Sequence, residues 1–224
     1  MYHSDLYYNE PIFRPPSEGK YSLLLTVTEG CAYNCTFCYP YRNKKFKIRK
    51  FDAILKDIKK AAQIYGSRVK RIFLLDGNAF IIKPSMLIKI ANACYQLLPN
   101  LNRITAYAHA HDILRKSVGE LKNIRKAGIT MVYVGLETGY NPLLKEINKN
   151  VTADEMVQAG QLLHQTNITL SGTIILGLGG NKQELSKMHA KATAELINKL
   201  NPPKLKKWYI SALTLMIPPN TPLE

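Results

Sequence analysis

The sequence predicts an α/β fold, namely a partial, open (β/α)6 TIM-like barrel of parallel strands. Six segments with strand character alternate with segments of helical spacing, and no internal repeat or low-complexity stretch interrupts them. Strands joined through crossover helices form parallel sheets. Six such units are fewer than the eight of a closed TIM barrel, and a chain of 224 residues suits a single α/β domain. We therefore expect an open barrel.

The individual elements follow from apolar spacing and from residues typical of helix ends. The predicted strands occupy residues 21–28, 69–75, 102–109, 129–136, 168–176 and 208–217. The predicted helices occupy residues 51–65, 84–98, 118–127, 152–166 and 182–200, with one or two helical turns at 142–147. In the first helix, Ile54, Ile58 and Ala61 recur at helical spacing. Thr152 and Glu155 resemble a capping box.

The domain organisation is simple. Residues 1–20 contain Pro11, Pro15, Pro16 and Gly19 and are expected to form an extended arm. Residues 21–224 are expected to form the core domain. No apolar run reaches the roughly 18 residues of a membrane span, and the polar, aromatic N-terminus lacks a signal-peptide layout. We therefore expect no membrane association.

Three of the four cysteines fall within one loop after the first predicted strand, as Cys31-x-x-x-Cys35-x-x-Cys38. Thiolates are soft ligands that suit iron–sulfur clusters, zinc and copper(I). Cys94 lies in an apolar helical pattern and is expected in the core, so the loop supplies three ligands. A structural zinc site usually has four protein ligands. The alternatives are a zinc site completed by a histidine and accidental clustering. Free thiolates and iron–sulfur clusters both point to a reducing, cytoplasmic compartment.

This cysteine motif, with Phe37 just before its last cysteine, resembles the cluster motif of the radical S-adenosylmethionine superfamily. The resemblance implies a 4Fe–4S cluster ligated by Cys31, Cys35 and Cys38, with one open iron for the amino and carboxylate groups of S-adenosylmethionine. It also implies reductive cleavage of the sulfonium, release of a 5′-deoxyadenosyl radical, and a reductant such as flavodoxin or ferredoxin. The family's core fold is the same (β/α)6 barrel.

Three further segments resemble the family's cosubstrate-binding positions, each at the end of a predicted strand. They are Asp76-Gly77-Asn78, where the family often has Gly-Gly-Glu; Glu137 within Val-Gly-Leu-Glu-Thr-Gly; and Gly177-Leu178-Gly179 before Gly180, where the family pattern ends in glutamate. The resemblance implies contacts with the methionine half, the ribose and the adenine, with Phe37 as an apolar neighbour of the base. The alternatives are an Asp-Gly turn at residues 76–77, a salt-bridged or helix-capping glutamate, and packing of Phe37 within its loop.

Strand alternation predicts which side chains point into the barrel. In the third strand Tyr107, His109 and His111 share the face opposite a run of alanines, and in the fourth strand Tyr133 points the same way. We predict that these four residues form the substrate side of the site. The alternative for each histidine is a hydrogen-bonded structural role. His164 and His189, on helices, are expected to face solvent; neither falls in the motifs above.

The formal charge of +15 is compatible with a nucleic-acid partner. The alternative is a Lys-rich solvated surface, which we favour because no RNA-binding module or aromatic platform is visible. One basic run, residues 42–50, follows the cysteine loop directly.

The function predicted from the sequence is therefore a radical S-adenosylmethionine enzyme acting on an unknown substrate. The nearest branch resembles the coproporphyrinogen oxidases, methylthiotransferases and elongator-type enzymes. Two alternatives remain, an RNA-modifying member of the family and a non-catalytic iron–sulfur or zinc module. A phosphate-binding Walker loop and a His-Glu-x-x-His zinc motif are both absent from the sequence.

Overall fold

The computed structural model describes residues 3–201, 207–217, 219 and 221–222. The predicted arm (1–20) and core (21–224) both include positions outside this part of the chain, namely residues 1–2 in the arm and 202–206, 218, 220 and 223–224 in the core.

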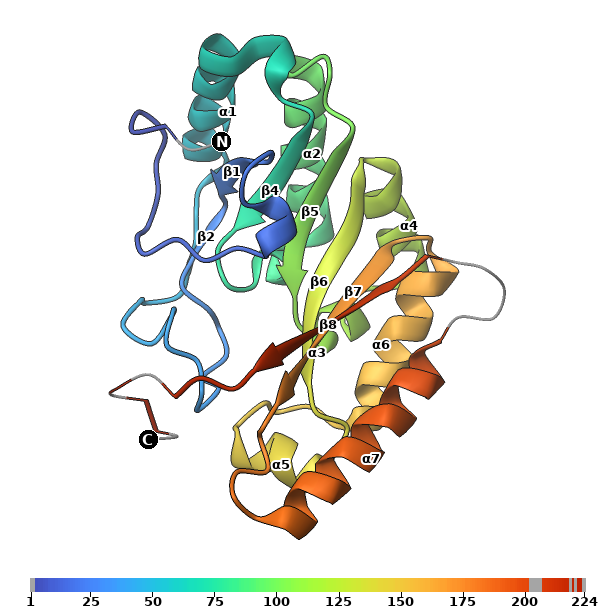
Figure 1. The fold of residues 1–224 in the computed structure, drawn as a ribbon. Helices are drawn as coiled ribbons and strands as arrows, with labels where there is room; N and C mark the ends of the chain where they lie inside the picture. Colours follow the sequence, from blue (N-terminus) through green and yellow to red (C-terminus); the bar gives the residue numbers. More distant parts are fainter. Residues whose placement is uncertain (1–2, 202–206, 218, 220, 223–224) are drawn as a thin grey trace.

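The centre of the molecule is a six-stranded parallel sheet whose strands differ in length (Figure 1). Its strands, in spatial order, are β1 (Leu23–Thr26), β4 (Arg71–Leu75), β5 (Arg103–Ala108), β6 (Ile129–Glu137), β7 (Thr169–Leu176) and β8 (Tyr209–Thr214). A separate antiparallel pair, β2 (Thr28–Glu29) and β3 (Lys47–Ile48), spans the base of the cysteine loop. Because β1 and β8 are the two edges and do not pair with each other, the predicted open α/β barrel is confirmed.

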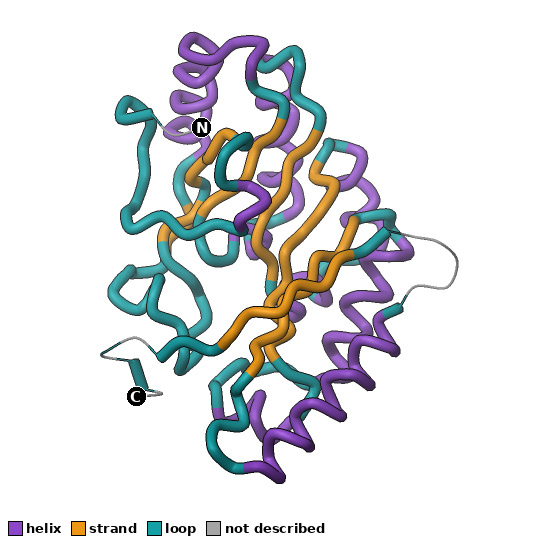
Figure 2. Tube along the Cα trace, in the orientation of Figure 1, coloured by secondary structure: helices purple, strands orange, loops and turns teal. Residues whose placement is uncertain are grey.

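The helices cover the convex side of this sheet (Figures 1 and 2). They are α1 (Phe51–Tyr65), α2 (Pro84–Leu97), α3 (Ala110–Leu114), α4 (Val118–Lys126), α5 (Asn141–Glu146), α6 (Ala153–Gln165) and α7 (Gln183–Leu200). Short 3-10 turns occupy Pro16–Glu18, Gly66–Arg68 and Ala79–Ile81. All the long predicted helices are confirmed to within about two residues at their ends, which is the usual uncertainty of helix boundaries.

Alternation along the strands sorts side chains onto two faces. Ile72, Leu74 and Val132 point toward the helices and belong to the main hydrophobic core, which also contains Cys94. Phe73 and Leu75 alternate with these residues and belong to a second, smaller cluster on the concave face. Cys94 is fully buried, as expected, and burial raises the pKa of its thiol to about 12. The concave face is therefore the side on which a ligand-binding site can form.

The short helix α3 is missing from the sequence-based expectation. Its five residues are too few for apolar periodicity to show. The side chain of His109 caps it by accepting a hydrogen bond from the His111 amide, so the chain leaves the strand before His111. His111 is consequently turned away from the concave face, and its Nε2 lies 3.2 Å from Glu155 Oε1 on α6. The expectation that His111 shares an inward face with His109 is wrong for this reason.

Two other histidines also differ from expectation. His164 and His189 were expected to face solvent, but both are buried. His164 Nε2 donates to the Leu200 carbonyl, 3.0 Å away. His189 Nε2 donates to the Ile175 carbonyl at 3.1 Å, and its Nδ1 lies 2.7 Å from Thr138 Oγ1. Each ring satisfies a backbone carbonyl at the end of an element, a role that single-sequence spacing does not reveal.

Two of the six basic residues at positions 42–50, Arg42 and Arg49, make contacts that stabilise the fold. The Arg42 guanidinium donates to the carbonyl oxygens of Cys35 and Thr36. Arg49 is buried and pairs with Asp57 on α1 at 2.7 Å. Lys45, Lys47 and Lys50 are exposed. This use of Arg42 and Arg49 favours a structural interpretation of the run. No helix in the described part of the chain is long and apolar enough to cross a membrane.

The capping box at the start of α6 is confirmed and gives a test of the fold. Thr152 Oγ1 accepts from the Glu155 amide, and the Glu155 carboxylate accepts from the Thr152 amide. Thr152→Ala should lower the free energy of unfolding by about 1 kcal/mol in urea denaturation, because one helix N-terminal amide loses its acceptor. Thr152→Ser keeps the hydroxyl and is the control. Equal stability of the two variants would contradict the capping role.

Candidate functional site: a cavity lined by three thiols

The cysteine loop is held in place at both of its ends. Gly30, at φ +68°, precedes Cys31, and a Cβ at this position would lie 2.6 Å from the Lys44 carbonyl oxygen. The buried Asp76 carboxylate accepts from the Gly30 amide and from Lys44 Nζ, each at 3.2 Å. Lys44 Nζ also donates to the carbonyls of Asn9 and Pro11. The loop is therefore fastened to the carboxyl end of β4 and to the N-terminal arm.

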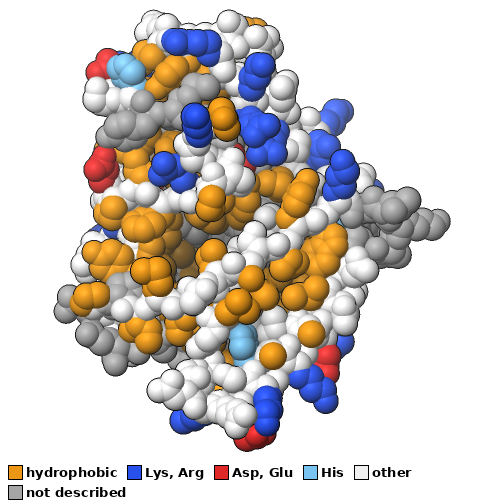
Figure 3. Space-filling model, viewed as in Figure 1, with side chains coloured by type: hydrophobic (Ala, Val, Ile, Leu, Met, Phe, Trp, Pro, Cys, Tyr) orange, Lys and Arg blue, Asp and Glu red, His pale blue; other side chains and the backbone are white. Residues whose placement is uncertain are grey.

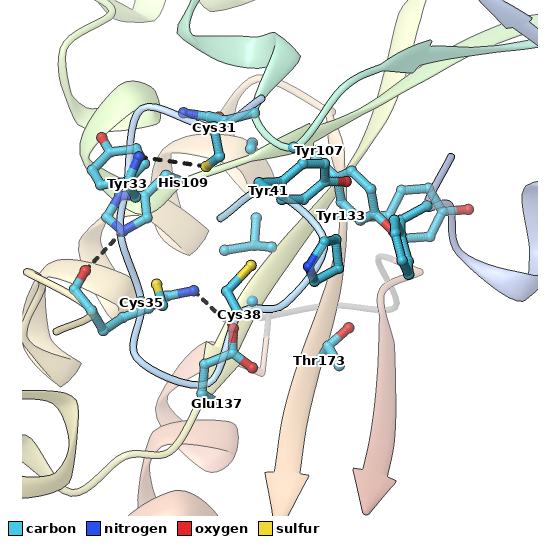
Figure 4. A pocket seen from close by; sticks show the side chains of 18 of the residues that line it. Cys31, Tyr33, Cys35, Cys38, Tyr41, Tyr107, His109, Tyr133, Glu137 and Thr173 are labelled. Atoms are coloured by element: carbon cyan, nitrogen blue, oxygen red, sulfur yellow. Dashed lines mark hydrogen bonds and ion pairs between the residues drawn. The ribbon is translucent and has the colours of Figure 1, made fainter. Parts of the chain in front are cut away.

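The three loop cysteines line one cavity of about 350 Å³ at the carboxyl ends of the strands (Figure 4). Its other lining residues are Phe13, Arg14, Tyr33, Phe37, Pro40, Tyr41, Gly77, Asn78, Tyr107, Ala108, His109, Tyr133, Val134, Gly135, Glu137, Lys149, Thr173, Ile175 and Leu213. Ligand sites of open parallel sheets lie outside the carboxyl ends of the strands. The structure thus brings together residues from the loop and from strands β4 to β8.

Burial controls the protonation of the thiols. It raises the pKa of Cys31 and Cys35, and it raises the pKa of Cys38 to about 11. The Lys149 ammonium opposes this effect at all three. The Tyr33 amide also lies 3.5 Å from Cys31 Sγ as a hydrogen-bond donor. The free thiols are therefore protonated, and an added positive centre would favour their thiolate forms.

The donor set fits an iron–sulfur cluster. Within the described residues, no three His, Cys, Asp or Glu side chains are arranged to hold a single metal ion. The thiols instead border a shared space into which they project from different parts of one loop (Figure 4). Thiolates are the protein ligands of 4Fe–4S clusters. Cys31, Cys35 and Cys38 are the residues that could hold one here.

Two of the three residues after β4 line the cavity. A Cβ on Gly77 would lie 2.7 Å from the Tyr41 ring and 3.0 Å from Cys31 Cβ, so only glycine fits there. Asn78 Nδ2 donates to Asp112 Oδ2 at 2.6 Å, while its Oδ1 is buried with no hydrogen-bond partner among the described residues. Asp76 is not among the lining residues. Its carboxylate is taken up by the loop contacts described above.

Glu137 lies at the end of β6 and forms a buried ion pair. Its Oε1 is 2.8 Å from Lys149 Nζ, and both side chains are more than nine-tenths buried. Although burial alone would lower it, the Glu137 carboxylate and Cys35 raise the pKa of Lys149. Glu137 has a φ of 61°, which directs it back across the strand end, and a Cβ on Gly135 would collide with its carboxylate. The pair places one anion and one cation beside the thiols.

Phe37 and the glycine-rich turn after β7 lie together at one wall of the cavity. Leu178 and Ile175 belong to one small apolar cluster, against which Phe37 packs. Gly177 has a φ of +92°. A Cβ on Gly179 would lie 2.7 Å from the Ser186 amide nitrogen at the start of α7. Gly177, Leu178 and Gly179 are not cavity-lining residues, so the turn supports the wall that Ile175 and Phe37 form.

His109 is held against the cysteine loop. Its ring stacks on Tyr33, with centroids 3.7 Å apart, and its Nε2 donates to the Lys149 carbonyl. The Tyr33 hydroxyl donates to Asp112, which also accepts from Asn78. Burial and the neighbouring Lys149 ammonium lower the pKa of His109 to about 3. His109 is thus a neutral imidazole at ordinary pH.

Tyr107 and Tyr133 lead from the thiols into the interior of the barrel (Figure 4). The Tyr133 hydroxyl donates to the buried Glu18 carboxylate at 2.6 Å, and burial raises the pKa of both tyrosines. Lys149 and Tyr33 also line the cavity, although the sequence patterns did not predict them. Tyr33 has a local signal, since it lies between two of the cysteines; Lys149 has none, because its place depends on the path of the chain after α5.

Comparisons with known proteins agree with this geometry. The family model described as "Radical SAM superfamily" matches residues 25–192, which include the whole cysteine loop and the strands from β4 to β7.

Curated relatives have about a quarter of their aligned residues in common with this chain. A tRNA-2-methylthio-N(6)-dimethylallyladenosine synthase of Ehrlichia ruminantium is 25% identical over 183 residues, covering 74% of this chain and 38% of the relative. The ribosomal protein uS12 methylthiotransferase RimO of Clostridioides difficile is 25% identical, with 79% and 41% covered. The heme chaperone HemW of Buchnera aphidicola is 27% identical, with 86% and 50% covered. The chain therefore spans half or less of these relatives.

Solved structures show the same fold. Methylornithine synthase (PylB) superposes with a TM-score of 0.64 at 17% identity, over 91% of this chain and 56% of that one. Coproporphyrinogen III oxidase (HemN) from Escherichia coli superposes with a TM-score of 0.62 at 12% identity, over 87% of this chain and 44% of that one.

The buried pair of Glu137 and Lys149 can be tested by a double-mutant cycle on the protein without added metal. Glu137→Gln and Lys149→Met should each lower the free energy of unfolding by about 3–5 kcal/mol, because each leaves a buried charge unpaired. The double variant should cost clearly less than the sum of the two. The exposed pair Lys187–Glu184, also at 2.8 Å, is the control, and Lys187→Met should cost under about 1 kcal/mol. Additive effects at residues 137 and 149 would contradict the coupling.

The lowered pKa of His109 predicts a pH dependence. The unfolded chain binds a proton at this histidine near pH 6.5, whereas the folded chain does so only near 3. The contribution of neutral His109 to the free energy of unfolding is therefore complete above about pH 6.5. It falls as the pH drops from about 6.5 to about 3. NMR of the metal-free protein should show His109 neutral at about pH 5, with the urea-denatured protein as the titrating control. A folded-state midpoint near 6.5 would contradict the burial argument.

Proposed function

Because the chain belongs to the radical SAM superfamily, we propose that it is an enzyme that cleaves S-adenosylmethionine reductively and directs the resulting radical onto a substrate. The observation that carries the proposal is the set of three thiols lining one cavity at the carboxyl ends of a parallel sheet. The thiols supply the soft ligands that a 4Fe–4S cluster requires.

Cys31, Cys35 and Cys38 are proposed as the cluster ligands, and their anchored loop holds them on one side of the cavity. When bound, a reduced 4Fe–4S cluster with one open iron supplies the electron that breaks the sulfonium bond of S-adenosylmethionine. Lys149 favours the thiolate forms of these cysteines by its charge. The surrounding aromatic rings, including Tyr33 and Tyr41, exclude water from the thiols.

Contacts with S-adenosylmethionine are proposed for residues that border the same cavity. Asn78 offers a buried amide oxygen that has no hydrogen-bond partner among the described residues and can accept from an ammonium group. Glu137 offers a carboxylate in the same cavity as the thiols, where it can accept hydrogen bonds from ribose hydroxyls. Gly77 allows close approach of the ligand to the backbone, and Phe37 gives the base an apolar surface.

We propose that two further features position the site without contacting the cosubstrate. They are Asp76 and the turn at Gly177, Leu178 and Gly179. Asp76 positions the cysteine loop through Gly30 and Lys44. The turn fixes the direction in which the chain leaves β7 toward α7.

The substrate is proposed to lie on the far side of the cavity, against Tyr107, Tyr133 and the neutral His109. Both tyrosines line the cavity with phenol groups, whereas both ring nitrogens of His109 are hydrogen-bonded to the backbone, so His109 would contribute the surface of its ring. His111 lies farther from this space, on α3, and is a weaker candidate for a role in catalysis. Electrons would come from a protein reductant such as flavodoxin or ferredoxin, in the reducing cytoplasm.

The relatives do not agree on one substrate. Their names refer to a modified tRNA adenosine, to a ribosomal protein and to heme. A second candidate function, modification of RNA, is favoured by the tRNA-acting relative and by the formal charge of +15. It requires binding of tRNA that weakens steeply with added salt. Binding that ignores salt, or no binding, would exclude it.

The ligand assignment is tested by one substitution and its control. After anaerobic reconstitution and reduction, wild-type protein with S-adenosylmethionine should yield 5′-deoxyadenosine and methionine. Cys35→Ala should abolish both the cluster absorbance and the cleavage, because one of three thiolate ligands is lost. Cys94→Ala removes a cysteine from the helix-side core and should retain both. A full cluster in Cys35→Ala, or zinc in place of iron in the wild type, would contradict the proposal and favour a non-catalytic metal module.

A further inference from the structure

A second cavity, of about 580 Å³, continues the first one into the barrel interior. The two cavities share five lining residues, which form the passage between them: Arg14, Tyr107, Tyr133, Thr173 and Leu213. The remaining lining of the second cavity consists of Pro15, Pro16, Ser17, Arg71, Arg103, Met131, Ser171, Tyr209 and Ser211. The whole lining contains three arginines and no aspartate or glutamate.

The arginines come together through the register of the sheet. Arg71 begins β4 and Arg103 begins β5, and the two are direct partners in the parallel pairing. Like charges placed side by side on neighbouring strands destabilise a sheet. Both positions lie on the concave face, since Phe73 and Tyr107 follow them at even spacing and point to the interior. The N-terminal arm adds Arg14, which lines both cavities.

Only one of these three charges is neutralised by a partner in the described part of the chain. Arg103 pairs with the buried Glu18 carboxylate at 2.9 Å, and its Nε is buried with no hydrogen-bond partner among the described residues. Glu18 also accepts from Tyr133 and Ser22. Arg14 and Arg71 form no ion pair with another described residue. Figure 3 shows Lys and Arg side chains over the upper part of this face and hydrophobic side chains around the hollow below.

We propose that the second cavity binds an oxyanion group, carboxylate or phosphate, of a small-molecule substrate, with Arg14 and Arg71 as its principal ligands and Arg103 as a third donor. Guanidinium groups bind both oxyanions through paired, charge-assisted hydrogen bonds. Ser171 and Ser211 on the facing strands supply hydroxyl donors. This inference rests on the proposed function, because it supplies that reaction with its class of substrate.

The geometry also sets the length of such a substrate. Arg103 and Tyr107 are four positions apart on the same face of β5, and a parallel strand rises about 3.3 Å per residue, so about 13 Å separates their Cα atoms. A molecule with its anionic group at the arginines would therefore extend to Tyr107 and Tyr133. Its other end would lie at the cavity that the three thiols border. The arginines would hold the substrate by its charge while the reacting carbon lies toward the cluster side.

The test uses simple probes on the full chain with its cluster reconstituted. Phenyl phosphate and benzoate carry the two oxyanions on an aromatic ring, and benzyl alcohol is the neutral analogue of similar size. Calorimetric titration should show that at least one anionic probe binds about tenfold or more tightly than benzyl alcohol, since a hydrogen-bonded charge contributes about that factor. Preference for phenyl phosphate or for benzoate identifies the oxyanion. Equal binding of benzyl alcohol would overturn the proposal.

Substitutions locate the binding. Arg71→Gln and Arg14→Gln should each weaken the anionic probe by about tenfold. Both side chains are exposed at the rim, so the fold should persist, whereas Arg103 is avoided because its loss would strand the buried Glu18. Arg68→Gln is the matched control. Arg68 is an exposed arginine outside both cavities that donates to the carbonyl oxygens of Ile64 and Tyr65 and lies over the Tyr65 ring. Unchanged binding in both cavity variants would overturn the proposal.

Two further outcomes separate this inference from the proposed function. Saturating S-adenosylmethionine should leave probe binding in place; stoichiometric displacement of the probe would place it in the thiol-lined cavity and overturn the inference. Cleavage of S-adenosylmethionine by the wild-type protein is measured in the same preparation. Cleavage without arginine-dependent probe binding rejects the oxyanion site alone, and probe binding without cleavage rejects the proposed function alone.

Discussion

One buried carboxylate holds the site together. Asp76 lies at the end of β4, almost without exposure, and accepts from the Gly30 amide and the Lys44 ammonium. These donors stand on the two sides of the cysteine loop. Burial raises the pKa of the Asp76 carboxyl, and the Lys44 ammonium opposes that shift. A charge buried in this way is costly unless it is paired and hydrogen-bonded. The contacts that satisfy Asp76 are therefore the same contacts that place three thiols on one cavity wall.

The open sheet determines which side chains lie opposite the thiols. Parallel strands deliver all their carboxyl ends to one edge, and alternation sends every second side chain to the concave side. Asn78, Glu137 and Tyr107 come from three different strand ends and border the same space. This space continues into the barrel as the second cavity, with which it shares Tyr107, Tyr133 and Thr173 among its lining residues. The same strands thus carry a thiol-lined end and an arginine-lined end.

The fold could be predicted from the sequence because the patterns that indicate its helices and strands are local. Apolar spacing in α1 and the capping box of α6 were enough to place these helices, and alternation placed Tyr107 and Tyr133 on the inner face. The positions of side chains that depend on tertiary contacts could not be predicted from the sequence. Lys149 meets Glu137 only because α5 turns the chain back, and His189 is buried because Ile175 and Thr138 lie against α7. His111 was misplaced because a helix of five residues leaves no periodicity.

The folded structure shows where the basic side chains lie, which the net charge alone does not. A sequence can report only a sum of charges, and a sum of +15 resembles that of a nucleic-acid-binding protein. In the structure, Arg49 and Lys149 are buried in ion pairs with Asp57 and Glu137. Arg71 and Arg103 lie side by side on the inner face of the sheet. Arg103 is paired with the buried Glu18, whereas Arg71 and Arg14 form no ion pair with another described residue. These two arginines line the cavity in which we propose that an oxyanion binds. Part of the positive charge therefore faces the interior of the barrel, where the proposed oxyanion site lies.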